Sequence, residues 1–386
     1  MDYKKYLTQD ILPFWLKNSI DNELGGIMNQ VDKYGNVIND EKNIWFIGRA
    51  LWTYAMSYRL VEPKEEYLNT CHTLFKFYDK CILPDNRLPH VTNREGVAKS
   101  VRPVYYYSEM FAVMGCAQYY RICKKMEVWN RAEEFFDTVY KLYQKNKTTT
   151  QEIGREIDCK TFGLHMAMLA TTQFIRNAAD DKEKYNLIID EIIFEMINGG
   201  YVDDNRKCVI EHIAMDGKML SGDDADMFCP GHIFEAAWFV LCEGEYRNID
   251  SYREFGKKLC NYAMPSGYEN YAEFIPTMSN LNKSPFGIDD GKYIWWPQCE
   301  AVIAYRVLYS IYDDSKYLEH ANRIEKSMFK AFADFEFGEW YCEINSKGLP
   351  TTSDKGNLIK GPFHIPRFLF ALISLEETGK ILSYIS

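Results

Sequence analysis

The chain has 386 residues, of which 47% are hydrophobic and 26% charged, a balance that excludes gross disorder. The 55 acidic residues outnumber the 45 basic ones, and the net charge of −10 argues against nucleic acid or an anionic membrane as the main partner. The 11 cysteines form no C-x-x-C pair, the N-terminal segment lacks a signal-peptide core, and no apolar run approaches the roughly 18 residues that span a bilayer. We therefore expect a cytoplasmic protein with reduced thiols.

Most of the chain has the hydrophobic periodicity of amphipathic helices. The pattern begins at residue 47 and returns at 109–123, 133–143, 165–175, 185–197, 233–242, 252–262, 300–312, 317–332 and 367–375. Short alternating patterns at 37–38, 200–202 and 339–344 indicate small β-hairpins, and the polar stretch 145–151 indicates a loop tip. No linker-like segment divides the chain, so we expect one all-α domain over residues 1–386 with short β-hairpins in its loops.

Polar residues recur beside the predicted helix starts at a spacing close to one sixth of the chain. They are Arg49, Glu109, His165, His232, Glu300 and His364, which are separated by 60, 56, 67, 68 and 64 residues. Such a spacing holds two helices and their loops. Six helical hairpins in a ring form an (α/α)6 barrel, which gathers one end of every inner helix around a central pocket.

Four helix starts combine ionisable side chains with Trp or Pro. His232 and Glu235 are three residues apart in PGHIFEAAW (230–238), and His364 and Arg367 have the same spacing in FHIPR (363–367). The other two starts are WWPQCE (295–300) and WFIGRALW (45–52), which hold Glu300 and Arg49. Any one of these side chains taken alone is more often structural, but buried ionisable groups need partners. Their repetition predicts one polar pocket.

The aromatic content of 15% is high, and aromatic rings both fill cores and cover the faces of sugars. Trp45, Trp52, Trp295 and Trp296 adjoin the predicted site, so we expect at least one to face the pocket. The sequence contains no H-E-x-x-H pair, P-loop, dinucleotide-binding glycine motif or G-x-S-x-G elbow. We therefore expect no metal, and two histidines at helix starts suit proton transfer near neutral pH instead.

These segments resemble the N-acylglucosamine 2-epimerase family, which includes renin-binding proteins, cellobiose 2-epimerases and mannose isomerases. The resemblance is carried in family order by ELGG (23–26), WFIGRALW (45–52), YSE (107–109), PGHIFEAAWF (230–239), WWPQCEA (295–301), GEW (338–340) and FHIPR (363–367). The family has an (α/α)6 barrel, in agreement with the spacing above. The resemblance implies a sugar 2-epimerase that removes and returns the C2 proton through an enediolate.

By resemblance, His232 and His364 match the acid/base pair of the family. The expected substrate-binding residues are Arg49, His165, Glu235, Trp296, Glu300 and Arg367. The chemistry requires no cofactor, and activation by a nucleotide such as ATP stays open. The expected partner is a small reducing sugar, with a homodimer also left open.

The substrate is less firmly indicated than the family. The leading expectation is interconversion of N-acetylglucosamine and N-acetylmannosamine, because the amino-acid sequences of the motifs most resemble those of the acylglucosamine branch. His165 instead resembles the cellobiose and mannose branches, Cys229 stands where Asn is expected, and Gln298 replaces a frequent His. The alternatives are an epimerase or aldose–ketose isomerase of unacylated sugars (mannose, glucose, fructose or cellobiose-type disaccharides), a glycoside hydrolase and a non-catalytic sugar binder.

Overall fold

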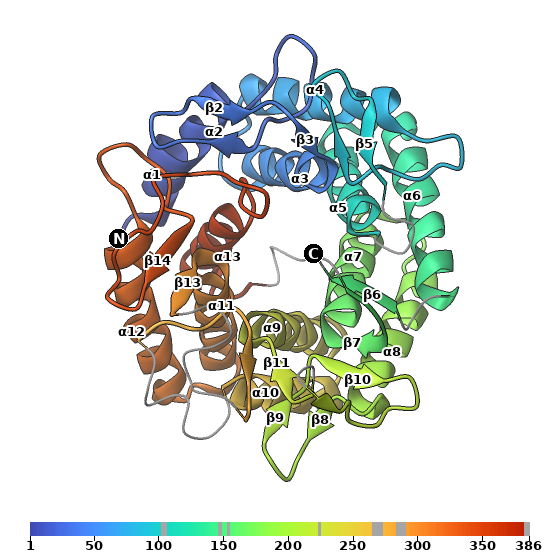
Figure 1. Ribbon diagram of the computed structural model, residues 1–386, viewed down its shortest axis with the longest axis vertical. Helices are drawn as coiled ribbons and strands as arrows, with labels where there is room; N and C mark the ends of the chain where they lie inside the picture. Colours follow the sequence, from blue (N-terminus) through green and yellow to red (C-terminus); the bar gives the residue numbers. More distant parts are fainter. Residues whose placement is uncertain are drawn as a thin grey trace.

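In the computed structural model, helices form two concentric rings around a central axis (Figure 1). The structure describes residues 1–101, 106–145, 149–152, 155–222, 225–264, 273–282 and 291–381. The inner ring consists of α3 (Ile44–Leu60), α5 (Tyr107–Cys123), α7 (Phe162–Ala178), α9 (Pro230–Arg247), α11 (Trp295–Tyr312) and α13 (His364–Thr378). The outer ring consists of α4 (Glu65–Cys81), α6 (Met126–Lys145), α8 (Glu183–Asn198), α10 (Asp250–Tyr262), α12 (Ser315–Phe332) and the N-terminal α1 (Tyr3–Tyr6), η1 (a π-helical turn, Leu7–Ile11) and α2 (Leu12–Asn18).

Neighbouring inner helices pack against one another around the whole circle, and α13 returns to α3. Each outer helix packs on the inner helix that precedes it in the chain, whereas α1 and η1 pack on α13. The first and last helices therefore close the ring together. At this junction the Tyr3 ring lies 6.5 Å from the Phe368 ring, and the Tyr3 hydroxyl donates to Glu325 at 2.5 Å.

Burial explains why the two rings differ in sequence. All residues from His364 to Ser374 in α13 are buried, because an inner helix is covered on every side. In the outer helix α10, burial is confined to Phe255, Gly256, Leu259 and Cys260, which form a single stripe. A helix covered all round is apolar all round, and an outer helix is amphipathic. Ionisable residues inside the inner ring therefore require local partners.

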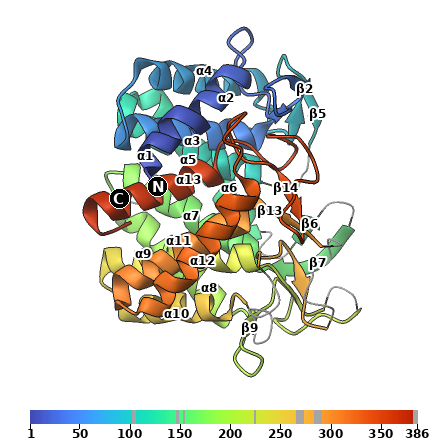
Figure 2. The ribbon, with the colours of Figure 1, turned by 90° about the vertical axis from the view of Figure 1, so that its left-hand side faces the viewer.

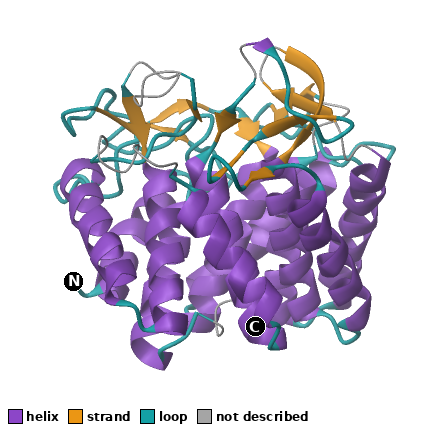
Figure 3. Cartoon of the chain, turned by 90° about the horizontal axis from the view of Figure 1, so that it is seen from below, coloured by secondary structure: helices purple, strands orange, loops and turns teal. Residues whose placement is uncertain are grey.

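The two ends of the barrel are built differently. At one end, inner helices lead to outer helices through short connections, and Lys124, Asn248 and Asp313 end α5, α9 and α11 in the left-handed conformation that terminates helices. At the other end, long loops enter the N-termini of the inner helices and carry the strands (Figures 2 and 3). These strands are β1 (Gln30–Val31), β2 (Val37–Asn39), β3 (Lys42–Asn43), β4 (Val91–Thr92), β5 (Ala98–Ser100), β6 (Thr149–Glu152), β7 (Arg155–Thr161), β8 (Val202–Asp203), β9 (Cys208–Val209), β10 (His212–Ala214), β11 (Met227–Phe228), β12 (Ser279–Asn280), β13 (Lys292–Ile294) and β14 (Glu343–Asn345).

Antiparallel pairing joins these loops around the rim. Strand β3 pairs with β4, β7 with β10, β11 with β12, and β13 with β14, so each pair connects the loop before one inner helix to the loop before the next. The pairs β1–β2, β4–β5, β6–β7 and β8–β9 are local hairpins. A bridge between Val31 and Gly356 connects the loop before α3 to the loop before α13. The pairing fixes the positions of the helix N-termini relative to one another.

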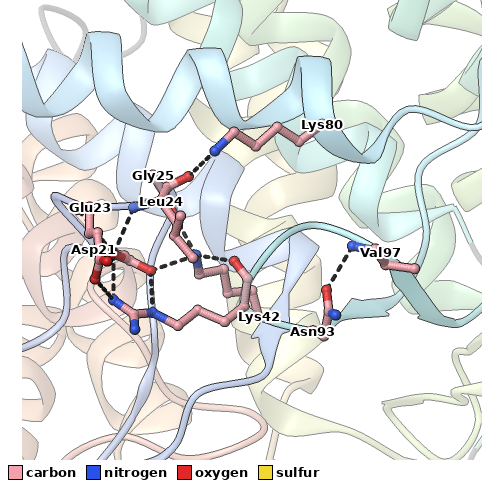
Figure 4. Close-up of polar contacts among 9 residues, drawn as sticks. Asp21, Glu23, Leu24, Gly25, Lys42, Lys80, Asn93 and Val97 are labelled. Carbon is pink, nitrogen blue, oxygen red and sulfur yellow. Dashed lines mark hydrogen bonds and ion pairs between the residues drawn. The ribbon is translucent and has the colours of Figure 1, made fainter.

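A buried ion cluster holds the rim beside α3 (Figure 4). Lys42, which is 0% exposed, donates to Asp21 Oδ2 at 2.9 Å and to the carbonyls of Gly25 and Arg94 at 2.6 and 2.7 Å. The Arg94 guanidinium makes two further hydrogen bonds to Asp21. Burial raises the pKa of Asp21, but Arg94, Leu24 and Lys42 outweigh burial and hold it well below its ordinary value. Three segments of the loop layer are thereby tied together.

The predicted fold class is confirmed, since the chain is mainly helical and its short strands lie in loops. The structure adds α4 and the N-terminal helices, which the periodicity did not identify. The hairpins expected at 37–38, 200–202 and 339–344 correspond to β2, to β8 and to a strand, β14, that begins at Glu343. The stretch 145–151 is only partly a loop tip, because α6 extends to Lys145 and β6 begins at Thr149; residues 146–148 lie outside the described ranges. Within those ranges, every helix is too short or too polar to cross a bilayer.

Candidate active site

A cavity of about 590 Å³ opens among the N-terminal ends of the inner helices. All six inner helices contribute to its wall. They supply Trp45 and Arg49 (α3), Tyr107, Met110, Phe111 and Met114 (α5), Leu164, Met166, Ala167, Ala170 and Thr171 (α7), His232 and Glu235 (α9), Trp296 (α11), and His364 and Arg367 (α13). Residues far apart in the sequence therefore meet in one pocket, as the repeat spacing predicts.

The backbone of the inner helices adds positive potential to this cavity. At all six N-termini the N-cap residue makes no side-chain capping hydrogen bond. The N-cap residues Asn43, Tyr106, Thr161 and Ile294 also line the cavity. A helix N-terminus carries a partial positive charge that falls off within its first turn. Six converging N-termini consequently favour negative charge that develops in the cavity.

His364 begins α13 and lies in a buried ion-pair cluster. Its Nδ1 is 2.9 Å from Oε1 of Glu300, whose other oxygen accepts a 2.9 Å hydrogen bond from the Trp238 indole. Arg367 Nη2 lies 2.5 Å from Glu235 Oε1 and 2.7 Å from Glu300 Oε1. The same nitrogen lies 3.2 Å from His364 Nδ1, so Nδ1 faces both a donor, Arg367 Nη2, and an acceptor, Glu300 Oε1. In the tautomer with its proton on Nδ1, a neutral His364 donates to Glu300. Its Nε2 then carries the lone pair.

The surroundings of His364 favour the neutral ring. Burial lowers its pKa well below the ordinary 6.5, and the cations of Arg367 and Arg49 lower the pKa further. Glu235 acts in the opposite direction but does not compensate. An imidazole that is neutral at physiological pH and held by a carboxylate is equipped to act as a base.

His232, in the first turn of α9, has the opposite electrostatic setting. Its Nδ1 donates to Glu211 Oε1 at 3.1 Å, and that oxygen also accepts from the Gly163 backbone amide at 3.1 Å. Burial by itself lowers the pKa of His232, but Cys229 and Glu211 outweigh burial and raise it well above 6.5. Correspondingly, burial raises the pKa of Glu211, whereas the adjacent His232 lowers it below its ordinary value. The pair is an imidazolium–carboxylate ion pair.

Trp296 connects the two histidines. Its ring centroid lies 5.5 Å from the His232 ring and 5.4 Å from the His364 ring, with interplanar angles of 31° and 35°. Two glycines permit this packing: a Cβ on Gly231 would lie 2.2 Å from the Trp296 ring, and one on Gly163 would lie 2.6 Å from His232 Nδ1. Both glycines are second residues of inner helices. The site therefore depends on bare backbone at two helix starts.

Arg49 approaches the cavity from one turn inside α3 and is 9% exposed. Its guanidinium carbon lies 4.2 Å from the Phe111 ring centroid, 4.8 Å from that of Trp45 and 4.9 Å from that of Phe363. Aromatic faces attract a cation and hold the planar guanidinium in place. The cation is thus held at the cavity wall within the same pocket as both histidines.

Most of the sequence-predicted site residues meet in this cavity, but His165 and Glu300 do not line it. Both are 0% exposed. His165 lies behind the wall, where its two ring nitrogens are within 2.7 and 2.8 Å of the Tyr143 and Tyr201 hydroxyls. Glu300 reaches the cavity only through His364 and Arg367. Neither side chain borders the cavity in this structure, and the assignment of both as substrate-binding residues stays a prediction.

The expectation that at least one of the four tryptophans faces the pocket is met by two of them. Trp45 and Trp296 line the cavity, whereas Trp52 and Trp295 are 0% and 1% exposed and pack in the core. Glu109, one of the six regularly spaced polar residues, also lies outside the cavity lining. Its carboxylate accepts hydrogen bonds from Arg87 at 2.6 Å and from the Leu88 amide at 2.8 Å.

Sequence reasoning missed Glu211, the partner of His232. Glu211 lies in the loop between β9 and β10, outside any helix pattern. One signal was available: this carboxylate stands inside the otherwise largely apolar run CVIEHI (208–213). A charge within an apolar run implies a buried partner. The cavity residues Met110 and Met114 carried no signal, because they read as core positions of α5.

Comparison with known proteins identifies the family. A sequence profile of N-acylglucosamine 2-epimerase (GlcNAc 2-epimerase) matches residues 25–359. The human N-acylglucosamine 2-epimerase is 25% identical over 97% of this chain and 88% of its own length. The cellobiose 2-epimerase from Bacillus thermoamylovorans B4167 superposes with a TM-score of 0.82 at 21% identity over 97% of this chain and 98% of that one. A D-mannose isomerase gives a TM-score of 0.82 at 15% identity over 96% and 97%. The chain belongs to the N-acylglucosamine 2-epimerase family.

Proposed function

We propose that this protein is a carbohydrate 2-epimerase, an isomerase, that interconverts N-acetylglucosamine and N-acetylmannosamine by removing and returning the C2 proton. The observation that carries the proposal is the opposite protonation of two imidazoles facing one cavity. Surroundings lower the pKa of His364 and raise that of His232. Pairs of titratable groups whose pKa values are pushed apart are assigned as base and acid.

The reaction needs a group on each face of C2. In the open-chain sugar the C1 carbonyl makes the C2 proton acidic, so a base at one face produces an enediolate. A proton delivered from the opposite face then inverts the centre. In the resting state His364 is the base, through Nε2, and His232 is the acid. In the reverse reaction the roles are exchanged, so the neutral His232 is the base and the protonated His364 is the acid.

Negative charge on the enediolate is balanced by the pocket. Arg49 and Arg367 supply two cations at the cavity wall, and the inner helix N-termini supply positive potential. Glu300 and Glu235 are positioning residues for His364 and Arg367, and Trp296 orients both imidazoles. His165 supports the α7 wall through its two tyrosine partners.

An acylated sugar fits the polarity of the cavity. On another part of the cavity wall, α5 and α7 present Met110, Met114, Leu164, Ala167 and Ala170. Such a wall suits an acyl methyl group better than the hydroxyls of an unacylated sugar. The second candidate is epimerisation or aldose–ketose isomerisation of mannose, glucose or a cellobiose-type disaccharide. It is suggested by the similarity of the fold to a cellobiose 2-epimerase and a D-mannose isomerase.

Glycoside hydrolysis is less well supported by the described residues. It requires an acid and a second carboxylate flanking the scissile bond. In the His364 cluster, Glu235 and Glu300 both face Arg367 Nη2 within 2.7 Å, so the two carboxylates form an ion-pair cluster.

We further propose one barrel domain over residues 1–386, located in the cytoplasm, with a small reducing sugar as its partner. The proposed chemistry uses side chains alone, so no cofactor is assigned to it. Activation by a nucleotide such as ATP and formation of a homodimer are separate hypotheses. The first is tested by rates with and without ATP, and the second by the mass of the protein in solution.

A sugar panel tests the function. The protein is incubated with N-acetylglucosamine, N-acetylmannosamine, mannose, glucose and cellobiose, and the products are separated. We expect the 2-epimer of each N-acetyl sugar and slower or no conversion of the others. Ketose from mannose supports the second candidate, cleavage of cellobiose supports a hydrolase, and no product from any sugar supports a non-catalytic binder.

A further inference from the structure

One of the two cavity histidines lies beside two other residues whose side chains can bind a metal. The three residues are Glu211 from the loop before β10, Cys229 just before α9 and His232 in the first turn of α9. Their ligand atoms, a carboxylate oxygen, Sγ and an imidazole nitrogen, all lie within 4.8 Å of one another. Glutamate, cysteine and histidine together form a donor set that zinc accepts.

The Glu211 carboxylate adds an independent indication of a missing ligand. Its side chain is 1% exposed, and its Oε1 accepts from His232 and Gly163. Its Oε2 is buried and has no hydrogen-bond partner among the residues that the structure describes. Leaving a buried charged acceptor without a partner costs more free energy than leaving a buried neutral group unpaired. A cation beside Glu211 would satisfy that oxygen.

The other carboxylate–histidine group in the cavity does not offer the same space. Glu235, Glu300 and His364 also place ligand atoms within 4.8 Å of one another. Between them, however, lies Arg367, whose Nη2 is 2.5 Å from Glu235 Oε1 and 2.7 Å from Glu300 Oε1. A fixed cation already occupies that centre, so the two clusters differ in their capacity for metal.

We infer that Glu211, Cys229 and His232 form a binding site for a thiophilic divalent cation, with zinc as the type case. The ligands are a Glu211 carboxylate oxygen, Cys229 Sγ and His232 Nδ1, and the fourth position faces the cavity. Binding displaces one proton from the thiol and one from the imidazolium. The two positive charges of the metal replace those two protons, so the site is electrically neutral before and after binding.

Metal at this site blocks the proposed catalysis. A His232 ring coordinated through Nδ1 no longer delivers a proton as an imidazolium, so zinc acts as a reversible inhibitor; this consequence rests on the proposed function. Access is through the cavity, because 27% of the His232 side chain is exposed while Cys229 and Glu211 are only 2% and 1% exposed. A bound sugar therefore slows metal entry or weakens metal binding.

Cobalt and zinc titrations of the intact protein test the site. Co²⁺ bound to a thiolate gives a charge-transfer absorption, which reports Cys229 without any measurement of activity. The test variant is Cys229→Ser. The matched control is Cys159→Ser, which removes another buried thiol beside a histidine, since Cys159 Sγ lies 3.9 Å from His212 Nδ1. Each variant is compared with its own metal-free rate, and circular dichroism confirms its fold.

We expect one equivalent of Co²⁺ with the thiolate band in the wild type and in Cys159→Ser, and no band in Cys229→Ser. Zinc should bind Cys229→Ser at least about tenfold more weakly, since losing even an outer partner typically costs 10–100-fold in metal affinity. Equal zinc affinity in wild type and Cys229→Ser, or no thiolate band in the wild type, would overturn the site. Zinc bound through Cys229 without inhibition would support the site and count instead against the role proposed for His232.

Discussion

Replacing Gly163 by alanine tests how closely His232 must be held. Gly163 is the second residue of α7, and a Cβ there would lie 2.6 Å from His232 Nδ1 and 2.8 Å from Glu211 Oε1. Ordinary contacts begin at about 3.4 Å, so the imidazole must move by roughly 0.8 Å toward the cavity. A misplacement of about 1 Å costs up to about 100-fold in rate. We therefore expect kcat to fall about 10- to 100-fold.

The same substitution leaves the barrel intact, because alanine is a better helix former than glycine. The assay is kcat for N-acetylglucosamine as a function of pH, together with the free energy of unfolding in urea. Moving His232 away from Glu211 also lowers the His232 pKa, so the alkaline limb of the profile shifts to lower pH. Glu211→Gln removes the charge without adding a Cβ and should shift that limb in the same direction. A Gly163→Ala rate within about twofold of wild type, with an unshifted limb, would refute the reasoning.

Three further predictions address acidity, stacking and stability. The rate should fall on the acid side only well below pH 6.5, as His364 gains its proton, and on the alkaline side well above pH 6.5, as His232 loses its proton. Trp296→Leu should reduce kcat/KM about tenfold, because the ring contacts both imidazoles and such aromatic contacts contribute about 0.5–1.5 kcal/mol each. Lys42→Met should lower the free energy of unfolding by about 3 kcal/mol, as for a broken buried ion pair. The Asp21 pKa is depressed on folding, so its stabilisation is present above the unfolded pKa of about 3.9 and is lost as pH falls below it.

Each of these predictions has a contrary result and a control. A single acid limb centred near the ordinary histidine pKa would contradict the opposite shifts of the two imidazoles. Trp52→Phe alters a tryptophan outside the cavity and should leave KM unchanged, so an equal loss there would remove the stacking argument. Lys80→Met removes an exposed lysine that donates to the Leu24 carbonyl, and urea unfolding should show a cost below about 1 kcal/mol. A similar cost for both lysine variants would contradict the buried cluster.

The fold was predictable because it is repetitive. His232 and His364 lie in the first turns of their inner helices and Arg49 lies in the second turn of α3, so their spacing reflects the repeat of a helical pair. The paired strands of the rim were not predictable in the same way. For example, β13 pairs with β14 through residues far apart in the sequence, with Lys292 opposite Asn345 and Ile294 opposite Glu343, and each strand has only three residues. Patterns this short carry no register information.

The candidate site was predictable where ionisable residues interrupt apolar helices, as at Glu235 and Arg367. It was not predictable where partners come from loops, as with Glu211. The sequence also could not show which residues of α7 line the cavity. Met166 lines it, whereas the side chain of the adjacent His165 lies behind the wall, between Tyr143 and Tyr201. The expectation of no metal rested on sequence spacing. Cys229 lies three residues before His232, but Glu211 joins these two residues only in three dimensions.

The central claim is that two imidazoles exchange the C2 proton from opposite faces. The most direct test is turnover of N-acetylglucosamine in deuterium oxide, with deuterium at C2 located by NMR, for the wild type, His232→Asn and His364→Asn. We predict one deuterium at C2 of every product molecule in the wild type. Each variant should lose net epimerisation by about 10²–10⁴-fold, and one of them should still exchange the C2 proton of one epimer, since exchange needs only one base. Product formed without deuterium at C2, or near-normal epimerisation in both variants, would contradict the account.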